Sequence, residues 1–142
     1  WHLLEHKDHS GIQCLIRDLN SYYKEIPGIA NGDIDKRYFE WIACSDADNG
    51  IIAFIRWGEN KEDCCIVVAH FTPILRENYR VGVPFLGYYK EILNTGSRIY
   101  GGLDFGNNGG LDAESIEWDD RPYSLLINLP PTSVSVFRYQ IN

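Results

Sequence analysis

The most numerous chemically active side chains of this chain are carboxylates, since 20 of its 142 residues are Asp or Glu. Cleavage or transfer at a glycosidic bond requires two carboxyl groups that are held a fixed distance apart. Most acidic residues here fall in turn-like segments, and Glu91 and Glu117 are the ones that stand near strand-like runs. Nothing in the sequence marks either of these two as an acid with a raised pKa. We therefore expect solvated charges, and we assign no catalytic residue.

The sequence also lacks the motifs of nucleophilic catalysis, of metal binding and of cofactor binding. Ser124, His70 and Asp104 supply the residue types of a hydrolase triad, but no nucleophile elbow surrounds the serine. The acidic turn 45–50 lacks the spacing and the final Glu of a calcium loop. Three histidines near the start fit no standard metal site: His2, His6 and His9. Segment 101–110 is rich in Gly but lacks the spacing of a phosphate-binding loop, so we expect neither a metal nor a cofactor.

Tryptophan rings are the best remaining candidates for a binding function, because an indole offers a flat apolar face and a polar edge that suit sugar rings. The four tryptophans are Trp1, Trp41, Trp57 and Trp118. Trp57 ends an apolar run and is expected in the core. We select Trp41 and Trp118 as candidate sugar contacts. Alternation places Trp41 on the same strand face as Phe39, which looks like a core residue, so Trp41 would have to lie at a sheet edge to be exposed.

One segment has the pattern of a helix. Ser10 and Gln13 form a capping box at its start, and Pro27-Gly28 ends it. Apolar residues recur on one face at helical spacing: Ile12, Leu15, Ile16, Leu19, Tyr23 and Ile26. We expect this stripe to rest on the remainder of the chain or on a second copy, because an uncovered stripe favours self-association.

The rest of the chain reads as strands separated by turns. The expected strands span 38–43, 51–57, 64–71, 80–85, 88–93, 123–129 and 134–139. The two nearly continuous apolar runs, 51–57 and 64–71, suit central strands that are covered on both faces. Strands of this spacing with Gly and Pro turns between them predict an antiparallel β-sandwich. In the loop 107–110, several residues should have positive φ, which Asn and Gly accept at low cost.

Composition sets further limits on partners and location. The formal net charge of −7 disfavours nucleic acid and anionic membrane surfaces. No apolar run approaches the ~20 residues that span a bilayer. Four cysteines, Cys14, Cys44, Cys64 and Cys65, include no C-x-x-C pair and are expected to be free thiols in a reducing cytoplasm. The chain starts at Trp1 and contains no Met, so we expect a piece of a longer protein.

The order of short motifs resembles the C-terminal β-domain of bacterial 1,4-alpha-glucan branching enzymes, also called glycogen branching enzymes. These motifs are FEWI, FTP, RVGVP, ILNT, YGG, GNNGG, EWDDRPYSL and LPP, and the likeness covers the whole chain. The chain departs from the usual family pattern at a few loop positions, including Gly96, His70 and the pair Asp119-Asp120.

The resemblance implies a division of labour within a longer enzyme. Residues 1–36 would be the last helix of the catalytic barrel and a linker, and residues 37–142 the C-terminal all-β domain. The family transfers α-1,4-glucan segments to form α-1,6 branches, and its catalytic carboxylates lie upstream of Trp1. The domain would cover the barrel and help to hold α-glucan such as glycogen. The alternatives are a free-standing carbohydrate-binding module, which has no need of the helix, and a structural domain that binds protein through the helix stripe.

Overall fold

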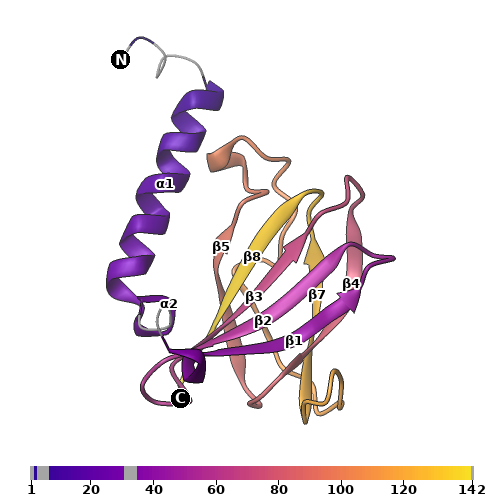
Figure 1. Cartoon of the computed structure of the whole chain (residues 1–142). Coiled ribbons are helices and arrows are strands. Elements are labelled where there is room, and N and C mark those ends of the chain that lie inside the picture. The colour runs from indigo at the N-terminus through magenta and orange to yellow at the C-terminus, as the bar shows by residue number, and fades with distance from the viewer. Residues whose placement is uncertain (1, 3–6, 31–34, 142) are drawn as a thin grey trace.

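The computed structural model describes residues 2, 7–30 and 35–141, which fold into a β-sandwich with a long helix along one side (Figure 1). The helical elements are α1 (Lys7–Glu25), α2 (Pro27–Ala30), η2 (Lys36–Tyr38) and η3 (Arg98–Tyr100). The strands are β1 (Phe39–Asp46), β2 (Ile51–Trp57), β3 (Cys64–His70), β4 (Arg76–Val83), β5 (Tyr88–Asn94), β6 (Gly110–Asp112), β7 (Tyr123–Leu129) and β8 (Ser133–Tyr139).

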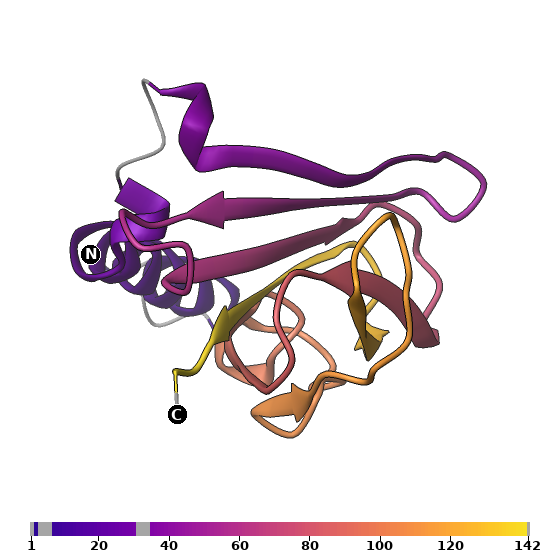
Figure 2. The ribbon, with the colours of Figure 1, turned by 90° about the horizontal axis from the view of Figure 1, so that it is seen from below.

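Two antiparallel sheets form the sandwich. One has six strands in the order β1-β2-β3-β8-β5-β6, and the other is the ribbon β4-β7. Figure 2 shows the ribbon facing one side of the larger sheet, while α1 lies against the other side. The expected fold class, an antiparallel sandwich preceded by one amphipathic helix, is therefore confirmed.

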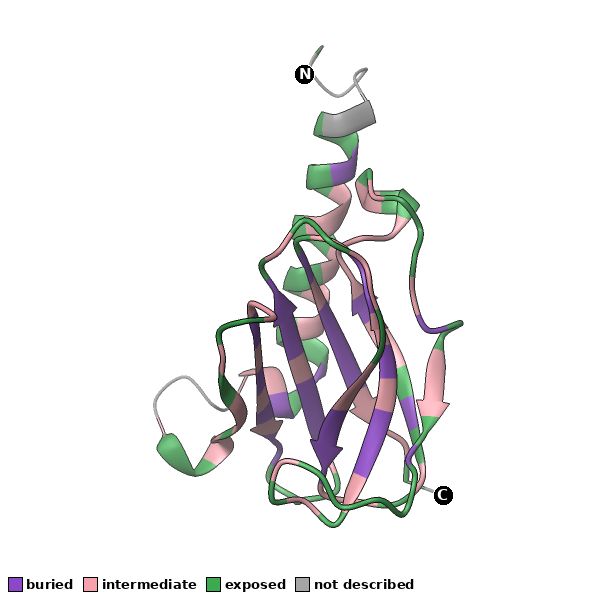
Figure 3. Cartoon of the chain, turned by 90° about the vertical axis from the view of Figure 1, so that its right-hand side faces the viewer, coloured by how far each residue is buried: buried purple, intermediate pink, exposed green. Residues whose placement is uncertain are grey.

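The main core fills the space between the two sheets. Alternate residues of β2 point into it and are fully buried, as are alternate residues of β4 and β7: Ile51, Ala53, Ile55, Val81, Val83, Leu125, Ile127 and Leu129. Figure 3 shows this buried band running through the centres of the strands. Period-2 burial is the consequence of side chains alternating between the two faces of a strand.

A second, smaller core lies between α1 and the outer face of the six-stranded sheet. It contains Ile26, Cys65, Leu93 and Val136, with Leu15 and Tyr22 packed against it. Cys64 instead belongs to the main core, so the two adjacent cysteines face opposite sides of β3 as expected. The prediction of cover on both faces is confirmed for β3, with the helix as the second cover. It is wrong for β2, because Ile52, Phe54 and Arg56 on its outer face are only half-buried.

The helix differs from its predicted form in its start and in the face that it buries. It begins at Lys7, so Ser10 lies within the helix and is not its N-cap. Gly11 is buried against the Tyr100 carbonyl, where an added Cβ would lie 2.8 Å from the oxygen. This close contact holds the helix against η3.

The apolar stripe is only partly covered. Leu15 and Ile26 pack on the sheet, but four of its members are 40–61% exposed: Ile12, Ile16, Leu19 and Tyr23. The face that meets the β-domain carries polar groups with partners there. Tyr22 donates to the Ile92 carbonyl at 2.6 Å, and the Tyr100 hydroxyl donates to Asp18 at 2.8 Å. These hydrogen bonds set the orientation of α1, which periodicity of apolar residues alone does not predict.

Positive φ angles occur in the loop 107–110 as expected. Asn108, Gly109 and Gly110 have φ values of 52°, 88° and 151°. Gly110 begins β6, a strand that the sequence did not predict and that pairs with β5. The segments that form this strand and η3 have three residues each, which is too short to show a period.

Candidate functional site

Trp41 lies on an edge strand and is half exposed. β1 is the outermost strand of the six-stranded sheet, and 50% of Trp41 remains accessible. Its ring stacks edge-to-face on Phe39 at 4.9 Å and on Phe54 at 5.9 Å. The expected edge position is therefore found, and the expectation that Phe39 is a core residue is wrong. Phe39 lies on the outer face of the sheet, because the main core lies on the opposite face of β1.

The backbone at Trp41 is fixed from the inner side of the sheet. The Glu40 carboxylate accepts from the Trp57 indole at 3.0 Å and from the Arg121 guanidinium at 2.6 Å. Arg121 also donates to the Trp41 carbonyl at 3.2 Å. Burial acts to raise the pKa of Glu40, but Arg121, Trp57 and Lys61 together lower that pKa below its usual value. The exposed Trp41 ring is consequently held by a rigid strand segment.

Trp118 lies at a tight corner that folds over β4. Trp118 and Arg121 exchange two backbone hydrogen bonds of 3.0 and 2.9 Å. The two residues between them, Asp119 and Asp120, have φ values of 51° and 56°, as a two-residue turn of this kind requires. The corner sits so close to Gly82 that a Cβ there would lie 2.1 Å from the Trp118 carbonyl oxygen. Trp118 itself is 47% exposed.

Trp57 does not contribute to this surface. Trp57 is buried in the main core as expected, with Lys61 over its ring at 4.3 Å. Trp1 lies outside the described residues. Among the described residues, Trp41 and Trp118 are the exposed tryptophans, and Arg121 bonds to the backbone of both.

Trp118 borders a large cleft at the open edge of the sandwich. Its volume is about 710 Å³. Residues from β1, β4, β7 and two turns line it: Ile42, Ala43, Asp46, Asn49, Asn78, Tyr79, Arg80, Trp118, Asp119, Asp120 and Leu126. The lining contains both apolar and polar groups, as ligand sites do.

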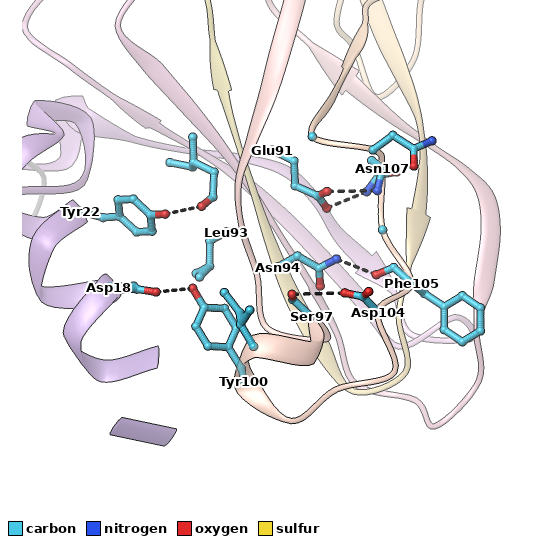
Figure 4. A pocket seen from close by; sticks show the side chains of 15 residues that line it. Asp18, Tyr22, Glu91, Leu93, Asn94, Ser97, Tyr100, Asp104, Phe105 and Asn107 are labelled. Carbon is cyan, nitrogen blue, oxygen red and sulfur yellow. Dashed lines mark hydrogen bonds between the residues drawn. The ribbon is translucent and has the colours of Figure 1, made fainter. Parts of the chain in front are cut away.

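A second, polar pocket of about 440 Å³ lies between α1, β5 and the glycine-rich loop (Figure 4). Asp18 and Tyr22 line it from the helix, and Glu91, Asn94 and Asn107 from the other side. Many of these side chains are committed to internal hydrogen bonds. Asn94, for example, donates to the Phe105 carbonyl at 2.7 Å and accepts from the Gly96 amide at 2.9 Å.

Glu91 corrects the expectation that the acidic residues are solvated charges. Burial raises the pKa of Glu91, although hydrogen bonds from Asn107 oppose the shift. Both carboxylate oxygens accept from Asn107, at 2.8 Å from the side-chain amide and 3.1 Å from the backbone. Because its oxygens are occupied, Glu91 serves as a tie between β5 and the loop. The sequence could not show this, since its partner is 16 residues away.

The hypothetical triad is not assembled. His70 bonds to the Pro130 carbonyl and to Thr72, whereas Ser124 donates to the Ile116 carbonyl. Asp104 accepts from the backbone amide of Arg98. Within the described ranges there is no group of three His, Cys, Asp or Glu side chains that could hold a metal ion, and none of the helices there is long and apolar enough to cross a membrane.

An antiparallel sandwich with a mixed cleft and exposed indoles at its edge defines an all-β domain. The sequence profile described as "Alpha amylase, C-terminal all-beta domain" matches residues 41–140, and the chain belongs to that family. Similarity to individual proteins also confirms the predicted resemblance to branching enzymes.

Several curated relatives share the name 1,4-alpha-glucan branching enzyme GlgB. The protein of Saccharophagus degradans is 45% identical over 97% of this chain, which covers 19% of the relative. The protein of Rubrobacter xylanophilus is 42% identical over 97% of the chain and 19% of its own length. The protein of Aquifex aeolicus is 41% identical over 99% of the chain and 22% of its own length. The chain therefore spans about a fifth of the curated relatives that it matches.

Proposed function

We propose that this chain is the C-terminal all-β domain of a cytoplasmic 1,4-alpha-glucan branching enzyme, which transfers α-1,4-glucan segments to form α-1,6 branches in glycogen. The observation that carries this proposal is identity of 39–45% to branching enzymes over nearly the whole chain. Catalysis belongs to another part of the parent enzyme. The domain contributes contacts with the catalytic barrel and with glucan.

Contact with the remainder of the catalytic barrel is assigned to α1. The four uncovered apolar residues of the stripe form a continuous face on this helix, and each large aliphatic residue buried there stabilises the contact by roughly 1.5–3 kcal/mol. Residues 1–36 are accordingly the end of the barrel and its linker, and residues 37–142 are the C-terminal domain. Part of the linker, 31–34, lies outside the described residues.

Contact with glucan is assigned to Trp41 and Trp118. An exposed indole on a rigid backbone loses little conformational freedom when a sugar ring stacks on it. Such contacts raise the local concentration of a polymer around the enzyme without any part in bond transfer. Phosphorylated or nucleic-acid partners are disfavoured by the net charge of −7.

Branching by the full-length protein that carries this chain tests the proposal. Loss of iodine staining by amylose, with new chains released by a debranching enzyme, is the expected result. Trp41→Ala should raise KM for long glucan and leave kcat unchanged. Phe71→Ala is the matched control, because Phe71 is an exposed aromatic residue outside both candidate contacts. A full-length protein that binds glucan but forms no α-1,6 linkage would contradict the proposal and favour a binding module.

A further inference from the structure

We propose that the cleft between β1 and β4, bordered by Trp118, is a binding site for an uncharged α-glucan segment that acts independently of the Trp41 ring. The inference rests on the proposed function, which it deepens by assigning the walls of one glucan site and the charge of its ligand. Four features of the cleft carry it: an open sheet edge, a rigid corner, a mixed lining and an excess of carboxylates.

The cleft exists because two strand edges face each other without pairing. β1 is the edge of the six-stranded sheet, and β4 pairs with β7 alone. The register of β1 shifts between Trp41 and Ala43 and again before Asp46, and that of β4 shifts between Arg76 and Tyr79. Such irregularities bend strands and terminate pairing. They leave a groove where a continuous ladder would otherwise close the sandwich.

The corner that carries Trp118 is held in place before any ligand arrives. The Gly82 amide donates to the Asp119 carboxylate at 3.0 Å, which ties the turn to β4. On the other side, Arg121 ties it to Glu40 of β1. A side chain presented by a fixed backbone avoids the ordering cost that a flexible loop incurs on binding.

The lining suits a sugar ring better than a purely apolar ligand. Trp118 supplies a half-exposed aromatic face at the mouth, and Ile42 and Leu126 supply apolar surface. The exposed side chains of Asn78 and Asp120 supply hydrogen-bonding groups for hydroxyls at the rim. Stacking on one face of the ring and hydrogen bonds at its edge are the two contacts that a pyranose offers.

The charge of the cleft selects against anionic sugars. Three carboxylates line it, from Asp46, Asp119 and Asp120. Arg80 is the one Lys or Arg side chain among the lining residues, and it is committed to Glu114 and Ser124. Burial raises the pKa of Asp119, its hydrogen bond from Gly82 opposes the shift, and Asp120 and Asp46 raise it further. A phosphate group would meet an excess of negative charge at this lining, whereas a neutral glucan would not.

The cleft and the Trp41 ring are separate. Glu40 points toward the inner side of the sheet, where it meets Trp57 and Arg121. Trp41, its neighbour in the strand, points to the outer face and packs on Phe39 and Phe54. Binding of glucan in the cleft should therefore leave the spectroscopic signal of the Trp41 indole unchanged, and binding at Trp41 should leave the signals of the cleft residues unchanged.

Nuclear magnetic resonance of the ¹⁵N-labelled chain during titration with maltoheptaose tests this inference. We expect the Trp118 indole and the amides of Asn49 and Asn78 to shift together with one apparent Kd. In Trp118→Ala, the apparent Kd obtained from the amide shifts should rise at least about tenfold. The Trp41 indole signal should shift with maltoheptaose as it does in the wild type. Phe71→Ala is the control and should leave all of these shifts unchanged.

The charge prediction uses a phosphorylated malto-oligosaccharide as the second probe. It should bind the cleft roughly tenfold more weakly than the neutral sugar, and Asp120→Asn should narrow that difference. If only the Trp41 indole shifts, the cleft inference is wrong and the proposed glucan contact stands. If no signal shifts, the glucan contact in the proposed function fails as well. Equal binding of both probes, or cleft shifts that Trp41→Ala removes, would also overturn the inference.

Discussion

Replacement of Asn107 by Ala should destabilise the chain more than its place in a glycine-rich loop suggests. The side chain is 2% exposed and makes three hydrogen bonds. It donates to Glu91 at 2.8 Å and to the Asn128 carbonyl at 3.1 Å, and it accepts from the Asn128 amide at 2.7 Å. Each lost bond costs about 1 kcal/mol and leaves a partly buried partner unsatisfied. We expect a total loss of about 3 kcal/mol, which corresponds to roughly 10 °C in Tm.

The loss should depend on pH because one of the partners is a carboxylate. Burial raises the pKa of Glu91, and the Asn107 donors hold it lower than it would otherwise be. Without the side-chain donor, the ionised form becomes more costly in the folded state, and the pKa rises further. The destabilisation is therefore largest above the folded pKa and diminishes as the pH falls through it and Glu91 takes up a proton.

Thermal unfolding followed by circular dichroism at pH 7 and at about pH 4.5 measures both effects. Asn60→Ala is the matched control, since Asn60 is exposed, and its change should stay within about 0.5 kcal/mol. A fall in Tm of less than about 3 °C at pH 7 would refute the role of Asn107 as a tie. An equal loss at both pH values would show that the bond to Glu91 is not the one that matters.

Three further predictions follow from burial and backbone geometry. In sedimentation velocity, the wild-type chain should self-associate through the uncovered stripe and Ile16→Glu should not; a wild type that stays monomeric at every concentration would contradict this. Mass spectrometry after treatment with a thiol reagent should show Cys44 modified in the native chain, while Cys64 and Cys65, whose pKa burial raises to about 12, react only on unfolding; native labelling of either buried thiol would refute it. Gly110→Ala should lower Tm because the new Cβ would lie 2.5 Å from the Tyr89 carbonyl oxygen; an unchanged Tm would show that the loop can move aside.

The strands could be predicted well because their signals are local. β2 and β7 have the predicted bounds, since each is an unbroken run of suitable residues between turn-forming segments. The opposite orientations of Cys64 and Cys65 also follow from alternation alone. β6 was missed because three residues beside a glycine loop carry no period.

The buried face of α1 and the candidate site could not be predicted from the sequence, because both depend on residues far apart in the chain. Apolar spacing predicted that Ile16 and Leu19 would rest on the remainder of the chain or on a second copy, and the hydrogen bonds of Tyr22 and Asp18, which turn another face toward the sheet, leave only the second of these open. The raised pKa of Glu91 was missed for the same reason, because burial by a loop far along the chain causes it. Trp41 was placed at an edge by its early, short strand, whereas the cleft beside Trp118 arises from two strand edges that no sequence spacing brings together.

Affinity electrophoresis of the native chain in gels with and without glycogen measures most directly whether this domain contacts α-glucan. Migration of the wild type should be retarded by glycogen in a concentration-dependent manner. The double variant Trp41→Ala/Trp118→Ala should migrate almost as fast with glycogen as without it, and Phe71→Ala should behave like the wild type. A wild-type chain whose migration is the same in both gels, or a double variant that is retarded as strongly as the wild type, would contradict the assignment of glucan contacts to these two indoles.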